Sequence, residues 1–170
     1  MLVAKLVLIN RIQSMPKQDF NINTLPAAAG DVYGLAFTNS TRLTFSTEDA
    51  QAAYGLAVQQ GAKSNTIKVG HVTGEVLGIT MRQNVLESKT RPGDGTINIP
   101  VGQPLAVMME GSINIVLKTA ITSADIGVSA TGEFGGVAAG YTKATNIKAL
   151  SYPANAGDVI PVHIVVALPK

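Results

Sequence analysis

The stretch Leu105-Ala-Val-Met-Met-Glu-Gly-Ser-Ile-Asn-Ile-Val-Leu117 decides the fold. Apolar residues occupy every second position before its central Glu110–Ser112, and they do so again after it. A period of two is typical of β-strands that have one face buried. Because glycine readily adopts the positive φ that a tight turn needs, the stretch predicts a β-hairpin that turns at Gly111.

The same period recurs along the chain. Leu77, Ile79 and Met81 alternate with small or polar residues, and residues 159–168 are apolar at both odd and even positions. A strand that is apolar on both faces is usually buried on both, so we expect this for the C-terminal strand. Turn residues separate these runs roughly every eight to twelve positions, which is typical of all-β proteins. The sequence therefore predicts a β-barrel or a jelly-roll-like sandwich.

One segment, residues 46–54, also fits a short helix. Ser46 is a suitable N-cap, and the acids Glu48 and Asp49 follow in the position of a first turn. Gly55 then ends any such helix early. The choice between helix and strand stays open, and we expect at most one short helix.

Residues 1–45 differ in character from the rest, and an apolar run near their start is Leu6, Val7, Leu8 and Ile9. Both faces of such a strand are apolar, so we predict that it contacts a partner subunit. We expect residues 1–45 to form an N-terminal extended strand or arm and residues 46–170 the β-barrel core of one structural domain. An ordinary first hairpin of the same barrel is the alternative. The run is too short for a signal peptide or a membrane span, which predicts a soluble protein.

Composition narrows the function. Only 14% of the residues are charged, against roughly 25% in typical soluble domains, so part of the surface is expected to pack against partners. The basic residues are scattered and there is no Trp, which argues against nucleic-acid binding. The chain has no Cys, which excludes disulfides, thiolate zinc sites and cysteine nucleophiles.

Candidate chemical residues are few. His71 and Glu75 are four residues apart, but the glycines between and beside them disfavour a helix that would align two ligands. His163 lies in an apolar strand, and we expect both histidines to be partly buried and hydrogen-bonded. The segment from Gly55 to Ser64 departs from a phosphate-binding loop in spacing. We therefore predict no catalytic residues, no metal and no cofactor.

Several short motifs, in this order, resemble those of tailed-phage capsid cement (decoration) proteins over about residues 54–166. The first is Tyr54–Gly61 followed by Asn65–Val69, and a "leucine-glycine-isoleucine" strand follows at Leu77–Arg82. The remaining motifs are Pro100–Val107, Glu110–Ile115, Asp125–Val128, Thr131–Phe134 and Ala156–Val162. About the first 50 residues have no counterpart.

The resemblance implies a β-barrel or jelly-roll-like core without catalysis or cofactor. It implies dimers or trimers on the outer surface of the head, with the major capsid protein and a second copy as partners and neither nucleic acid nor membrane involved. A fibre or adhesin β-domain that binds a host ligand is the alternative. A third possibility is a trimeric β-enzyme, for which the turn acids Asp94, Asp125 and Asp158 are the candidates.

Overall fold

The computed structural model describes residues 27–34, 40–50, 52–70, 73–83 and 99–166. The described residues form nine strands and no helix, which confirms the all-β prediction. The strands are β1 (Thr41–Thr47), β2 (Ala57–Gln60), β3 (Thr66–Val69), β4 (Gly78–Thr80), β5 (Pro104–Val116), β6 (Asp125–Ser129), β7 (Phe134–Gly135), β8 (Tyr141–Ala149) and β9 (Val159–Ile164).

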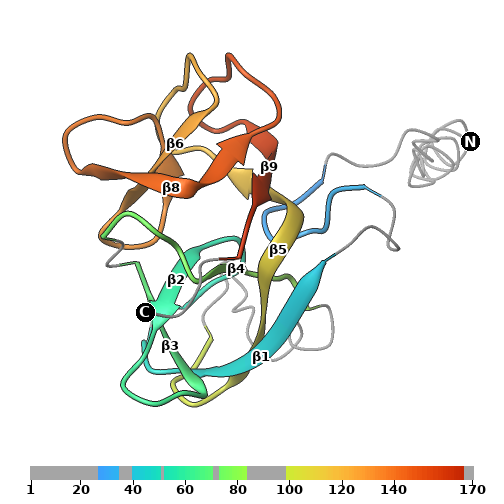
Figure 1. Ribbon diagram of the computed structural model, residues 1–170, viewed down its shortest axis with the longest axis vertical. Helices are drawn as coiled ribbons and strands as arrows, with labels where there is room; N and C mark the ends of the chain where they lie inside the picture. Colours follow the sequence, from blue (N-terminus) through green and yellow to red (C-terminus); the bar gives the residue numbers. More distant parts are fainter. Residues whose placement is uncertain (1–26, 35–39, 51, 71–72, 84–98, 167–170) are drawn as a thin grey trace, which may run out of the picture.

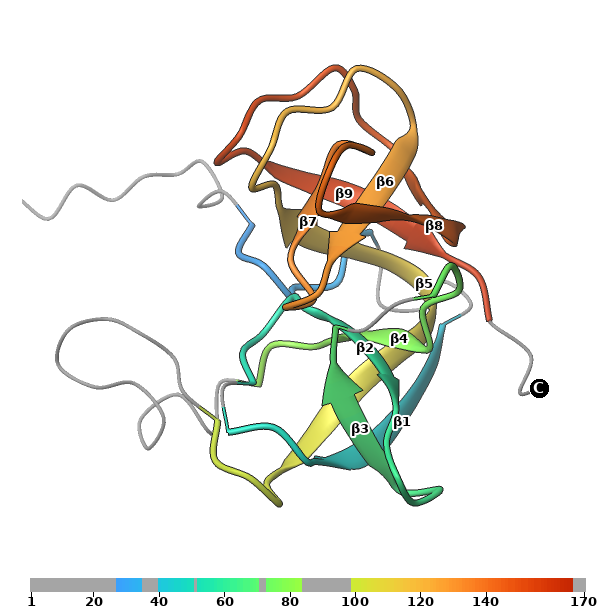
Figure 2. The ribbon, with the colours of Figure 1, turned by 90° about the vertical axis from the view of Figure 1, so that its left-hand side faces the viewer.

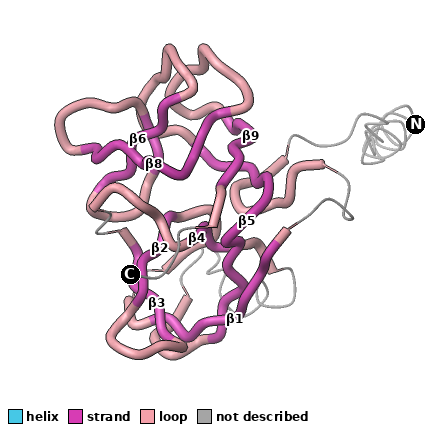
Figure 3. Tube along the Cα trace, in the orientation of Figure 1, coloured by secondary structure: helices cyan, strands magenta, loops and turns pink. Residues whose placement is uncertain are grey.

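The strands form two lobes, which lie one above the other in Figures 1 and 2. In the lower lobe the order is β1-β3-β2-β4-β5, and β1 pairs back with β5 to close a barrel. In the upper lobe the order is β5-β9-β8-β6-β7, and a bridge from Leu117 to Phe134 places β7 beside the chain that follows β5. The predicted β-barrel is confirmed, and Figure 3 shows how loops connect the strands at both ends of the molecule.

β5 belongs to both lobes. Its 13 residues run without reversal through Gly111, so the predicted hairpin is wrong. Before Gly111 the strand pairs with β1 and β4, and from Gly111 onward it pairs with β9. Gly111 has a φ of 127°, and a Cβ there would lie 3.1 Å from the Cβ of Ser40. The freedom of this glycine redirects one strand from one barrel to the other.

The apolar residues of β5 contribute to two core clusters. Leu105 and Val107 are fully buried in the lower cluster, with Phe45 and Ile67. The second cluster contains residues from every strand of the upper lobe: Ile113, Ile115, Leu117, Ile126, Val128, Phe134, Ala144, Ile147, Ile160, Val162 and Ile164. It continues into the lower lobe through Ala57, Val76, Ile79, Met81 and Met108. The period of two therefore predicted the burial of Leu105, Val107, Ile113 and Ile115. It did not predict the burial of Met108 and Asn114, the partial exposure of Met109, or the path of the strand.

A second joint between the lobes depends on close backbone approach. The N–H of Ala57 donates to the carbonyl oxygen of Gly132 over 2.9 Å, and the N–H of Gly70 donates to the carbonyl oxygen of Ala57 over 2.8 Å. A Cβ on Gly132 would lie 2.7 Å from that same Ala57 oxygen. Only glycine lets the β6–β7 turn approach the lower barrel this closely.

The helical alternative for residues 46–54 does not hold for the residues described. Ser46 and Thr47 belong to β1, and Ala52 forms a β-bridge with Ile99. The Thr47 hydroxyl oxygen accepts the N–H of Asp49 over 3.2 Å, and the Asp49 carboxylate accepts the N–H of Val69. The polar residues that resemble a cap and a first turn therefore stabilise a loop that joins neighbouring strands. β1 lies across the predicted arm boundary at residue 45, and the division into arm and core stays a prediction.

The prediction that the C-terminal strand is buried on both faces is wrong. Ile160, Val162 and Ile164 of β9 lie in the upper core, whereas Val159 and Val165 point outward and are 37% and 52% exposed. The upper lobe is a barrel, so the outer face of each strand meets solvent unless another chain covers it.

Candidate interaction surfaces

The residues predicted to form an interface, Leu6, Val7, Leu8 and Ile9, lie outside the residues that the structure describes, as do His71 and Asp94. The described surface carries four features that could bind a partner or a ligand. These are one edge of β1, a groove between the lobes, a polar pocket beside Asp125 and the exposed apolar side chains Leu150 and Val159 of the upper lobe.

The first feature is the outer edge of β1, formed by Thr41–Phe45. β1 pairs with β5 from Thr41 to Ser46, but it pairs with β3 only at Ser46 and Thr47. Within the described chain, Thr41–Phe45 is thus paired along one side only. An unpaired strand edge is a ready template for another strand. The sequence of Thr41–Phe45 has the pattern of a strand. Because these residues fall within the predicted arm, the sequence does not identify them as an open edge of the barrel.

The backbone groups at this edge can be assigned from the ladder. The N–H of Thr47 donates to Gln103 on the β5 side, and the N–H of Ser46 donates to Asn65 on the opposite side. Successive residues of a strand point their N–H and C=O groups to opposite sides. The N–H and C=O of Arg42 and Thr44 therefore point away from β5, along the outer edge of β1.

Side chains at this edge leave the lower core partly open. Leu43 lies on the same strand face as Phe45 and opposite Val107, both of which are buried. Leu43 is nevertheless 50% exposed, and Met109 packs against the same cluster while only partly buried. An apolar side chain on the inner face of a barrel strand is normally covered by the next strand, and here none of the described strands covers it.

A groove of about 480 Å³ lies between the lobes. Its walls combine small residues such as Ala29 and Gly55 with the rings of Tyr54 and Phe134. Lys118 and Glu133 also line the groove and form an ion pair, with the Lys118 Nζ 3.3 Å from the Glu133 Oε1. This mostly apolar lining suits packing against a side chain better than acid–base chemistry.

A second pocket, of about 320 Å³, is more polar and is lined by Thr119, Ser123, Asp125 and Lys143. The Asp125 carboxylate accepts hydrogen bonds from Lys143 over 2.6 Å and from Lys148 over 2.5 Å. These two ammonium groups, with Lys143 contributing most, hold the pKa of Asp125 well below its ordinary value, at about 2. Asp125 is therefore an ionised structural partner of lysines, which is a poor setting for a general base.

Asp158, the other described acid of the enzyme hypothesis, is held in a turn. Its carboxylate accepts the N–H of Asn155 over 2.7 Å, and its own N–H donates to the Asn155 carbonyl oxygen over 3.2 Å. The turn predicted at Asn155–Asp158 is thus present, and the acid stabilises it. The contacts of Asp125 and Asp158 are thus those of structural residues.

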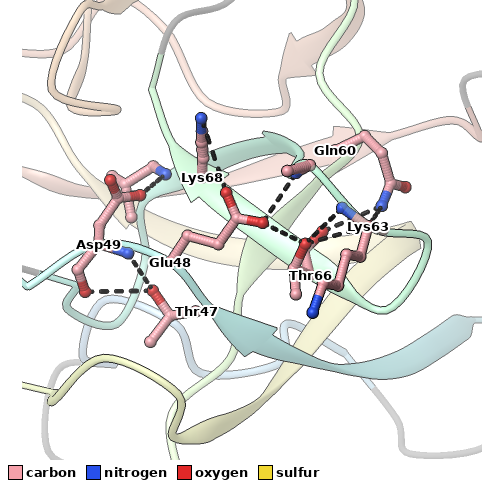
Figure 4. Close-up of polar contacts among 9 residues, drawn as sticks. Thr47, Glu48, Asp49, Gln60, Lys63, Thr66 and Lys68 are labelled. Atoms are coloured by element: carbon pink, nitrogen blue, oxygen red, sulfur yellow. Dashed lines mark hydrogen bonds and ion pairs between the residues drawn. The ribbon is translucent and has the colours of Figure 1, made fainter.

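Another carboxylate, Glu48, joins β1 to the loop between β2 and β3 (Figure 4). It accepts the Ala62 N–H over 2.8 Å and the Thr66 hydroxyl over 2.5 Å, and the Lys68 ammonium lies 3.6 Å away. These contacts, above all the one from Thr66, lower the pKa of Glu48. The pKa is lowered because these donors stabilise the charged form of the carboxylate. The contacts of Glu48 thereby fix β1 to the loop between β2 and β3 at the lower end of the barrel.

His163 lies on the outer face of β9, and its Nδ1 is 3.1 Å from the Ser112 hydroxyl oxygen. The expected hydrogen bond is therefore present, but the expected partial burial is wrong, because the side chain is exposed on a strand that is covered on one face only. Among the described residues no group of three or more His, Cys, Asp or Glu is placed to hold a metal. No described helix is long and apolar enough to cross a membrane.

One solved structure agrees with the fold. The chain is similar to a chain of the solved structure titled "The capsid of Myoviridae Phage XM1", with a TM-score of 0.58 and 15% identity, over 84% of this chain and 92% of that one. A weaker likeness, with a TM-score of 0.39 and 16% identity, covers 78% of this chain and all of the head fiber gp8.5 N base of bacteriophage phi29. No curated protein matches.

The sequence comparison is more specific than the structural one. Residues 17–164 match the family described as XM1 gp53 minor capsid protein, and this span is most of the 170-residue chain. The prediction of a tailed-phage capsid family is confirmed, and the chain belongs to the XM1 gp53 minor capsid protein family.

Proposed function

We propose that this virion structural protein is a cement protein, which binds the outer surface of a tailed-phage head and stabilises it through protein–protein contacts. The observation that carries the proposal is the family match over residues 17–164. The partners would be the major capsid protein and further copies of this chain, as dimers or trimers. The low charge of the sequence, 14% of residues, supports a role in which much of the surface is covered.

Exposed apolar side chains on the upper lobe support the same role. Val159 pairs with Val116 across β9 and β5, and the N–H of Leu150 donates to the Pro161 carbonyl oxygen, so these residues share one region of the sheet. Val159 and Leu150 are 37% and 51% exposed. Apolar side chains gathered on an outer strand face favour packing against another protein.

The N-terminal run Leu6, Val7, Leu8 and Ile9 is the second element of the proposal. We propose that it contacts a partner subunit, since burial of both apolar faces removes more apolar surface from water than burial of one. An arm of this kind adds buried area to each contact without enlarging the folded core. Interfaces of standard size bury roughly 1,600 Å².

Such a protein acts by mass action. A protein that binds only the assembled shell shifts the equilibrium between shell and free subunits toward the shell. Repetition over many sites on one particle multiplies the effect through avidity. No chemical step is involved, so the protection should follow occupancy of the shell.

The test compares genome release against temperature for particles with and without this chain. Decorated particles should release their genome at a higher temperature. Because no chemical step is involved, His163→Gln, which keeps a polar side chain on the outer face of β9, should change the protection only as far as it changes folding. Identical release curves, with the chain demonstrably bound, would reject cementing.

A further inference from the structure

We propose that the outer edge of β1 accepts the apolar run Leu6–Ile9 from a second copy of this chain as an added β-strand. The inference deepens the proposed function, on whose interfacial arm it rests, by naming the surface that receives the arm. It follows from the unpaired edge, from the half-open core beside it and from the length of the chain before residue 27.

The edge offers specific backbone partners. The N–H and C=O groups of Arg42 and Thr44 point away from β5, and within the described chain no hydrogen bond of these backbone groups is present. Strand addition to such an edge supplies main-chain hydrogen bonds for affinity, while side-chain contacts give specificity. Thr41–Phe45 spans about 17 Å, which accommodates the four residues of Leu6–Ile9 at about 13 Å.

The side chains fit an apolar strand. Leu43 is 50% exposed although it faces the lower core, and Met109 beside that core is only partly buried. A strand added along Arg42–Thr44 would place alternate apolar residues over Leu43. Because Leu6–Ile9 is apolar on both faces, the other face stays available to the surface of the head.

The length of the arm allows exchange between copies. The arm enters the described chain at Ala27, close to where the N–H of Gly30 donates to Asn114 of β5. Asn114 and Met108, the partner of Arg42, are six residues apart on β5, or about 20 Å. Residues 10–26 reach up to about 56 Å, which is enough to extend to the β1 edge of a neighbouring copy. Exchange of arms around a closed ring pairs every arm with every edge.

Cysteine cross-linking tests the contact directly, because the chain has no Cys of its own. One set of full-length chains carries a single Cys at Leu6, Val7, Leu8 or Ile9, and the other carries Thr44→Cys. Mixed and oxidised, they should form disulfide-linked pairs that contain one chain of each kind. Two alternate positions of the four should react best, as the period of a strand requires. Thr142→Cys, at an exposed position of β8, replaces Thr44→Cys in the control.

Two outcomes of this experiment would overturn the inference. One is cross-linking to Thr44→Cys that is no stronger than cross-linking to Thr142→Cys. The other concerns a chain that carries both a Cys in the arm and Thr44→Cys. If its oxidation gives a disulfide-linked monomer rather than a linked pair of chains, the arm pairs with its own β1.

A backbone variant checks the hydrogen bonds. Thr44→Pro removes an N–H that points away from β5, so the ladder between β1 and β5 stays intact, whereas strand addition is blocked. Self-association should weaken about tenfold, while Thr44→Val, which keeps the N–H, should associate like the wild type. Circular dichroism and thermal unfolding confirm that Thr44→Pro is folded. A folded Thr44→Pro chain that associates like Thr44→Val contradicts strand addition.

The two proposals fail separately. If the cross-links form but decorated and bare particles release their genome at the same temperature, strand exchange stands and cementing is rejected. If the particles are protected but no cross-link to Thr44→Cys exceeds the control, cementing stands and the acceptor edge is rejected.

Discussion

Gly111 of β5 lies opposite Ile164 of β9, and this pair begins the ladder of the upper lobe. One residue earlier on the same strand, Glu110 pairs with Thr41 of the lower lobe. The change of partner therefore occurs between two adjacent residues. A single glycine with a φ of 127° stands at the point where one barrel ends and the other begins.

Gly111→Ala should destabilise the protein more than an alanine at another glycine with positive φ. A Cβ at Gly111 would lie 3.1 Å from the Cβ of Ser40 and 3.3 Å from the Met108 sulfur, whereas a Cβ at Gly157, with a φ of 91°, meets nothing within 4 Å. We expect a loss of about 1 kcal/mol for Gly157→Ala and about 2–3 kcal/mol for Gly111→Ala. Urea unfolding of both variants measures the difference, and equal losses would show that the joint tolerates a side chain.

Because the lobes share β5, they should unfold together. Val107→Ala removes buried volume from the lower core, and Ile115→Ala removes it from the upper core. Each should lower the free energy of unfolding by about 2–4 kcal/mol and move one common transition. Circular dichroism and calorimetry check this in parallel. Two separated transitions, one affected by each variant, would mean that the lobes are independent.

The sequence predicted part of the burial pattern and little of the topology. Alternation at Leu105, Val107, Ile113 and Ile115 identified the residues that fill the cores, because the period of two depends only on local strand geometry. Whether Gly111 reverses a strand or redirects it depends on which strands lie beside it. Those neighbours come from distant parts of the chain, so the local pattern could not distinguish the two.

The outer edge of β1 could not be predicted for the same reason, because a local pattern does not show which strands lie beside it. The segment from Thr41 to Thr47 has the pattern of a strand, but only its pairing reveals that one edge is open. For β9, two apolar faces indicated burial on both, whereas Val159 and Val165 are exposed. An apolar outer face has the same sequence pattern whether it is covered by its own chain or by a partner, so the pattern alone could not predict its exposure.

The ion pairs of Asp125 should make stability depend on pH in a defined window. The pKa of Asp125 is lowered to about 2 in the folded state, against about 3.9 for an unfolded chain. The stabilisation is therefore fully present above about pH 4 and is lost as the pH falls toward 2. The melting temperature of the wild type should exceed that of Asp125→Asn at pH 6, and the gap should narrow below pH 4.

Salt provides the control for this prediction. Lys143 and Lys148 have side chains that are 49% and 54% exposed, so ions in solution screen both pairs. The gap between wild type and Asp125→Asn at pH 6 should shrink as salt is added. A gap that is independent of both pH and salt would point to a packing role for residue 125.

The contact between Thr66 and Glu48 should control the loop between β2 and β3. Thr66→Val keeps the shape of the side chain but removes the hydroxyl that donates to Glu48 and that accepts the Lys63 N–H over 3.0 Å. The amides of Ala62 and Lys63 should exchange with solvent faster, and the pKa of Glu48 should rise toward its ordinary value. Nuclear magnetic resonance measures both, with Thr142→Val on β8 as the matched variant that should change neither.

Removal of residues 1–12 should separate folding from assembly. The described lobes bury their cores among residues 45–164, so the deletion should leave the β-signal of circular dichroism largely intact. If the run Leu6–Ile9 contacts a partner, the shortened chain should self-associate or bind heads more weakly, as measured by analytical ultracentrifugation and by co-sedimentation with particles. Loss of folding instead would assign the segment to the core and reject the arm.

A variant of full length distinguishes loss of the apolar contact from loss of chain length. Leu6→Thr with Leu8→Thr keeps residues that favour strands but makes one face of the run polar, and Val7→Thr with Ile9→Thr does so for the other face. If one face packs over Leu43 and the other against the head, one variant should weaken self-association and the other should weaken binding to heads. Equal effects of both variants on both measurements would show that the run does not bind as a strand with two distinct faces.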